Sequence, residues 1–222
     1  MGLLSKHLEK NCESQLAGEL NFSVQEAYRY LHELINANPI LKRKEMNKSL
    51  GHIRQGLVDV ALDVVLSDSP IKSDVQMIPA KNNTNGYTYS MIEVKGAIIS
   101  PVKVRNRKYM PRKAVHRSTA SVLNRQFDLF YSQEDINEEY SKDTPPFILL
   151  TYGGKNHQLE FVQLGLPDVS TEKWVDRLEI SNVPRLQIAD GKQEETRKKL
   201  DLTLTAYSED LLRREINGEN KI

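Results

Sequence analysis

The sequence is poor in the residues that would reveal its chemistry at once. Only one cysteine, Cys12, occurs in 222 residues, so the chain has no internal disulfide framework and no metal site made of cysteines alone. No apolar run approaches the roughly 20 residues that a membrane-spanning helix needs. The first ten residues become charged too soon for a secretory signal. We therefore expect a cytoplasmic protein without a membrane partner.

Common catalytic motifs are also missing. The five histidines show no H-E-x-x-H spacing, the glycines form no phosphate-binding P-loop, and G-x-S-x-G does not occur. These absences argue against a zinc hydrolase, a P-loop enzyme and a serine hydrolase of the nucleophile-elbow type. The formal net charge is +1, so no overall positive field indicates a nucleic-acid partner. A nucleic-acid function would have to rest on the local distribution of charge.

What the chain does contain is typical of a globular protein. It is 39% hydrophobic and 27% charged, with both signs nearly balanced. A chain of this length can bury a substantial core without disulfides. We expect one compact domain made of a helical N-terminal region (1–70), an α+β core (71–190) and a C-terminal helix (191–222).

Two helices are predicted in the N-terminal region. Apolar residues recur every three or four positions through "NFSVQEAYRYLHELINAN", which begins at Asn21. Ser23 and Glu26 have the spacing of a capping box, and Pro39 ends the helix. A second wide apolar stripe runs through "NKSLGHIRQGLVDVALDVVLSDSP", where Ser69-Pro70 stops it.

The pattern then changes to β-branched and aromatic runs between turn residues, which predict strands. "DVQMIPA" and "YTYSMIEVKGAIISPVKV" flank the turn signal "NNTNG", and "FILLTYGG" and "QLEFVQLGLP" flank "GGKNH". Helices are predicted at 118–131, around Trp174 within 164–180, and in the charged tail. The predicted fold class is α+β, a small mixed or antiparallel sheet built from two hairpins and flanked by N-terminal and C-terminal helices.

One triplet in this region has the residues of a metal-dependent hydrolase. Glu93 and Lys95 are two apart in a predicted strand, which would place both on one face. A carboxylate there can hold Mg²⁺, and an ammonium group can orient the attacking water beside a phosphodiester. Asp74, in the partner strand of the same hairpin, would be the second acid.

Together these residues resemble the PD-(D/E)xK restriction-nuclease-like superfamily. The resemblance covers "SDVQMI", the turn and "YSMIEVKG". It implies that Asp74 and Glu93 share a magnesium ion and that Lys95 serves the nucleophile. It also implies that Gln126 in "LNRQFDLF" is an additional polar residue of the site. The alternative reading is a half-exposed strand with Ile92 and Val94 inward and the polar residues outward.

A basic segment follows the triplet. Residues 95–125 contain no Asp or Glu, and an acidic stretch, 132–143, comes next. Lysine and arginine interleaved with Tyr109 and His116 could follow a phosphate backbone. The alternative is a basic loop that pairs internally with the acidic stretch. The candidate nucleic-acid-binding residues are Lys103, Arg105, Arg107, Lys108, Arg112, Lys113 and Arg117.

These features predict a protein associated with DNA or RNA, as a magnesium-dependent nuclease or a degenerate relative of one. The alternative function is a non-enzymatic regulatory or inhibitory module that binds a protein or self-associates through its C-terminal helix. The small size and the lack of a cofactor motif suit an accessory protein of a phage or mobile element.

Overall fold

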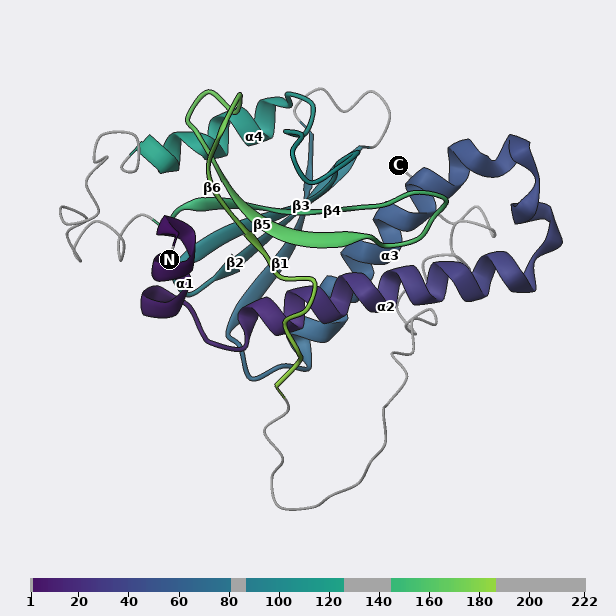
Figure 1. Cartoon of the computed structure of the whole chain (residues 1–222), viewed down its shortest axis with the longest axis horizontal. Coiled ribbons are helices and arrows are strands. Elements are labelled where there is room, and N and C mark those ends of the chain that lie inside the picture. Colours follow the sequence, from purple (N-terminus) through teal and green to yellow (C-terminus); the bar gives the residue numbers. More distant parts are fainter. Residues whose placement is uncertain (1, 81–86, 126–144, 187–222) are drawn as a thin grey trace, which may run out of the picture. The chain divides into compact units, whose positions relative to one another are not determined.

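The computed structural model describes residues 2–80, 87–125 and 145–186, which belong to one compact unit, Met1–Asp190. This unit is α+β, as predicted, with helices and a six-stranded mixed sheet (Figure 1). The predicted C-terminal helix lies outside the described residues.

The N-terminal helices are α1 (Leu3–Asn11), α2 (Leu16–Ala37) and α3 (Asn47–Ser67). Two short 3₁₀ turns, η1 (Pro39–Lys42) and η2 (Lys44–Met46), join α2 to α3. Helix α2 begins before the predicted capping box, because the buried residues Leu16 and Leu20 extend its apolar stripe. Ser23 is therefore inside the helix, where its hydroxyl donates to the Glu19 carbonyl at 2.8 Å.

The sheet order follows the sequence from β1 to β6. Strands β3 and β4 are parallel, and every other neighbouring pair is antiparallel. The parallel pair therefore joins two antiparallel three-stranded units. The strands are β1 (Ser73–Pro79), β2 (Thr88–Val94), β3 (Ala97–Lys103), β4 (Phe147–Gly153), β5 (Phe161–Pro167) and β6 (Trp174–Glu179).

The single strand predicted over residues 87–104 is two strands. A turn at Lys95-Gly96 separates β2 from β3, and Val94 pairs with Ala97 across it. Gly96 has a φ of 83°, and a side chain there would meet the Asn11 carbonyl oxygen. Glycine tolerates both the positive φ and the close approach, so this residue permits the turn.

The helix predicted around Trp174 is wrong. Trp174 begins β6, and Asp168 organises a turn before it. One Asp168 carboxylate oxygen accepts the N–H groups of Glu172 and Lys173 at 2.8 and 3.0 Å. The other accepts the Ser170 hydroxyl at 2.6 Å. Ser170 thus supports a turn instead of capping a helix, and the following residues extend the sheet beside β5.

Helices cover both faces of the sheet. Figure 1 shows α2 and α4 (Val115–Ala120) on opposite sides of it. The helix predicted from Ser118 begins three residues earlier, in α4, and continues as a 3₁₀ turn, η3 (Ser121–Asn124). The end of that predicted helix, beyond residue 125, lies outside the described residues. Within the described part of the chain, no helix is long and apolar enough to cross a membrane.

Candidate nucleic-acid interface

Strands β2 and β3 separate in the middle of the sheet. They pair only from Val94 and Ala97 to Ile92 and Ile99. Beyond that point β2 stays paired with β1 as far as Thr88, and β3 stays paired with β4 as far as Lys103. The sheet therefore splits, and each strand presents an unpaired edge to the gap.

Pro101 explains where the split begins. Ile98 and Val104 donate their N–H groups to the carbonyls of Pro146 and Tyr152, toward β4. Every second residue of β3 faces the same neighbour, so the nitrogen of Pro101 faces β2. Proline has no N–H to donate, and the ladder cannot continue past Ile99. The Ser100 hydroxyl instead donates to the Ser90 carbonyl at 3.1 Å. Pro101 therefore encodes in the sequence where the gap between β2 and β3 begins.

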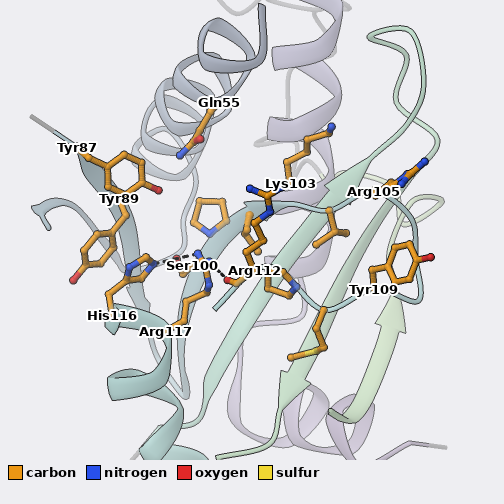
Figure 2. Close-up of a pocket in the computed structure, with 15 residues that line it drawn as sticks. Gln55, Tyr87, Tyr89, Ser100, Lys103, Arg105, Tyr109, Arg112, His116 and Arg117 are labelled. Carbon is orange, nitrogen blue, oxygen red and sulfur yellow. Dashed lines mark hydrogen bonds between the residues drawn. The ribbon is translucent and has the colours of Figure 1, made fainter. Parts of the chain in front are cut away.

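A pocket of about 750 Å³ occupies the split. One wall comes from the start of β2, another from the end of β3 and the loop after it, and Gln55 of α3 adds a third. Figure 2 shows Arg105 and Tyr109 on the side of the pocket away from Tyr89 and His116. The lining residues with polar or charged side chains are Gln55, Tyr87, Tyr89, Ser100, Lys103, Arg105, Tyr109, Arg112, His116 and Arg117.

The pocket is positively charged. Four of the seven basic residues predicted to bind nucleic acid line it: Lys103, Arg105, Arg112 and Arg117. No Asp or Glu is among its described lining residues, and no ion pair to any of these four is found within the described ranges. A concave surface with charges of one sign concentrates the opposite charge. This arrangement suits an anion with several negative groups.

Arg117 is held in the pocket by its own loop. Its guanidinium donates to the Arg112 carbonyl and lies 3.3 Å from Nε2 of His116 (Figure 2). The group is half-buried, and this burial lowers its pKa because the charged form loses part of its hydration. A guanidinium has five N–H donors, and these two contacts leave others for a ligand. An anion would therefore restore solvation that Arg117 lacks.

Lys103 reaches the same region from β3. Burial, followed by repulsion from Arg54 of α3, lowers the pKa of its ammonium group. The same two factors, in the same order, lower the pKa of His157, with a further contribution from Lys103. Groups that repel one another in this way are relieved by a bound negative charge. The positive charge around the pocket thus extends to Arg54 on α3.

Tyr89 and His116 form an aromatic wall. Their ring centroids are 3.9 Å apart and their planes differ by 12°, so the rings stack (Figure 2). Burial and the nearby Arg117 lower the His116 pKa to about 4. At neutral pH His116 is therefore an uncharged ring, and it contributes a flat surface instead of a cation.

The other predicted basic residues lie elsewhere. Arg107 pairs with Glu179 of β6 at 3.1 Å, and Lys113 pairs with Glu172 at 2.6 Å. Lys108 is exposed and does not line the pocket. The basic segment is therefore partly neutralised by internal pairs, although with partners other than those expected. The acidic stretch at 132–143 lies outside the described residues.

The candidate metal ligands meet across the first hairpin. Asp74 and Glu93 are direct partners in the β1–β2 register, and both are exposed. Residues opposite each other in an antiparallel pair share a face, with Cβ atoms about 5 Å apart. Both line a depression of about 450 Å³ near the end of α3, together with Lys72. The Asp74 carboxylate accepts the Gln76 amide at 2.6 Å.

Lys95 is not where the triplet implied. Strand β2 ends at Val94, so Lys95 lies in the turn after the strand and not within the strand as the E-x-K reading expected. Gln126 lies outside the described residues. Within the described ranges, no group of three or more His, Cys, Asp or Glu side chains could hold a metal ion. Ile92 and Val94 are buried, as the strand-face reading expected.

Sequence reasoning missed four polar residues of the pocket, which are Gln55, Tyr87, Tyr89 and Ser100. These side chains are uncharged and follow no motif, so the local sequence does not indicate that they line a site. They come together only because β2 and β3 stop pairing. A proline inside a predicted strand was the one available sign, because it marks a break in a ladder.

Comparison with known proteins gives no indication of function, so the evidence for function comes from the pocket and the hairpin described above. No protein-family model matches the sequence, and no curated protein or solved structure is significantly similar to it.

Proposed function

We propose that the protein binds nucleic acid through the basic pocket between β2 and β3. The observation that carries this proposal is the set of four cations around one concavity without an acidic neighbour among its described lining residues. Contacts to phosphate supply most of the affinity of a protein for a nucleic-acid backbone.

The chemistry of the wall favours a polynucleotide over a simple inorganic anion. Lys103 ends β3 and Arg105 lies in the loop after it, whereas Arg112 and Arg117 come from the loop before α4 and from α4 itself. The cations are thus spread over different elements, as successive phosphates require. The stacked rings of Tyr89 and His116 add an aromatic surface. A basic groove with aromatic side chains is typical of single-strand binding.

The Arg117→Gln variant tests this function. We expect it to bind a fluorescein-labelled single-stranded octamer roughly tenfold more weakly than the wild type, because it removes a charge-assisted hydrogen bond. Fluorescence anisotropy in EDTA measures the affinity without any metal. Lys113→Gln is the control, since that ammonium already pairs with Glu172 outside the pocket. Equal weakening in both variants, or no binding by the wild type, would count against the proposal.

A second candidate function, a magnesium-dependent nuclease, rests on the β1–β2 register. Two carboxylates opposite each other repel, and a shared cation removes that cost. The pair fits Mg²⁺, which is commonly held by one or two carboxylates and several waters. Asp74 and Glu93 would hold the ion, which would supply a polarised water and stabilise phosphate charge. Lys95 would act from the adjoining turn.

The nuclease is tested with single- and double-stranded DNA and RNA in Mg²⁺ or Mn²⁺. We expect cleavage in the wild type and at least tenfold slower cleavage by Lys95→Ala and by Glu93→Gln, read on denaturing gels. Binding of uncleaved strands by the wild type would exclude the nuclease and leave the basic pocket as the functional site. Failure both to bind and to cleave would favour the alternative of a regulatory module that recognises a protein.

A further inference from the structure

A second cavity adjoins the basic pocket. It has a volume of about 590 Å³ and lies between α4 and the outer face of the β1–β2 hairpin. Its described lining includes Ile78 and Met91 from the strands and Val115 and Ala120 from α4, with no lysine, arginine, aspartate or glutamate. The cavity is therefore large enough for a small organic group, and it favours an uncharged one.

The two cavities share a wall. Tyr87, Tyr89 and His116 line both of them. On one side of these rings are the four cations, and on the other is the apolar space. A ligand that spans the wall must therefore be anionic in one part and flat or apolar in another.

We propose that the apolar cavity receives one unpaired base of a single strand whose phosphates lie in the basic pocket. This inference rests on the proposed function and names its substrate class. Bases of a duplex are stacked on their neighbours, so only an unpaired base can leave the strand and enter a cavity. The strand can be DNA or RNA, because both carry flat aromatic bases on a phosphate backbone.

The shared wall has the properties that base stacking requires. Tyr89 and His116 already stack with nearly parallel planes, so a base would extend an existing stack. The low pKa of His116 keeps its ring neutral, which makes the wall aromatic and not ionic at physiological pH. Stacking on an aromatic side chain contributes about 1–3 kcal/mol per base. Thr119 and the two tyrosines also line the cavity, and their hydroxyl groups can donate or accept hydrogen bonds.

The test compares an ordinary octamer with an abasic octamer of equal phosphate number, in both DNA and RNA form. We expect the ordinary strand to bind the wild type roughly tenfold more tightly than the abasic strand, at low salt and in EDTA. A 2-aminopurine in the ordinary strand should lose fluorescence when it stacks. The readout is the ratio of the two affinities, measured by competition within each protein.

Two variants locate the effect. Thr119→Trp places a large ring in the cavity from an exposed position on α4, so folding should tolerate it. The ratio should fall close to one in Thr119→Trp and also in Tyr89→Leu. Equal binding of ordinary and abasic strands by the wild type would overturn the base site while leaving phosphate binding intact. A tenfold ratio that survives Thr119→Trp would overturn it too. If neither strand binds the wild type, the proposed function itself fails.

Discussion

The double variant Lys103→Gln/Arg117→Gln should bind a single-stranded octamer roughly a hundredfold more weakly than the wild type. Both side chains line the basic pocket, and partial burial lowers the pKa of each cation, so a bound anion would stabilise both charged forms. A hydrogen bond to a charged group contributes about 1.5–3 kcal/mol, and about 1.4 kcal/mol corresponds to a factor of ten. Two such losses at separate phosphates give the expected effect, measured by anisotropy in EDTA.

The control for this result is Arg107→Gln/Lys113→Gln, which removes the same two charges from the same basic segment. Arg107 and Lys113 are already paired with Glu179 and Glu172. We expect the affinity of the control to stay within about threefold of the wild type, because exposed charges away from the site act only through screened long-range fields. Equal losses in the two double variants would mean that net charge, and not the pocket, determines binding.

Asn124→Ala should lower the free energy of unfolding by about 3 kcal/mol or more. Asn124 is fully buried, and its amide donates to the carbonyls of Phe147 and Pro167 at 2.9 Å each. Its side-chain oxygen accepts the Phe147 N–H at 2.8 Å. Truncation leaves three backbone groups without these partners, and a buried unsatisfied group costs about 1–3 kcal/mol. Urea denaturation followed by circular dichroism measures the change.

Val122→Ala in the same 3₁₀ turn is the matched control. Its side chain is 46% exposed, so we expect a change within about 0.5 kcal/mol. Asn124 fixes η3 to the start of β4 and the end of β5, and η3 continues directly from α4, which contains His116 and Arg117. A small effect of Asn124→Ala would show that this anchor does not hold α4 against the sheet.

Hydrophobic periodicity correctly predicted the helices and strands whose apolar residues repeat at regular local spacing. The stripes in α2 and α3 follow directly from residues three and four apart, and the runs that became β4 and β5 are buried along their full length. Such patterns depend on local spacing, so a sequence reader can find them.

The errors in the prediction arise where contacts between distant residues determine the secondary structure. Lys95-Gly96 is a turn because Gly96 adopts a positive φ beside Asn11, a residue far away in sequence. Trp174 begins a strand because β5 offers an edge and Asp168 supplies the turn before it. Neither the edge nor the contact with Asn11 is visible in the local pattern.

The candidate site was predictable in composition but not in shape. The absence of acids in residues 95–125 was evident, whereas the division into pocket residues and ion-paired residues was not. Glu172 and Glu179, which come much later in the sequence, neutralise two of the cations. The aromatic wall required the β2–β3 split at Pro101. The charge of the segment can be read from the local sequence, whereas the shape of the pocket depends on where the strands stop pairing.

The salt dependence of binding tests the central claim most directly. If four cations contact phosphates, the logarithm of the affinity for a single strand should fall against the logarithm of the salt concentration with a slope of about −2.8 in the wild type. Lys103→Gln/Arg117→Gln should halve that slope to about −1.4, while Arg107→Gln/Lys113→Gln should keep the wild-type value. A slope that is the same in all three proteins would contradict the claim that this pocket holds the phosphates.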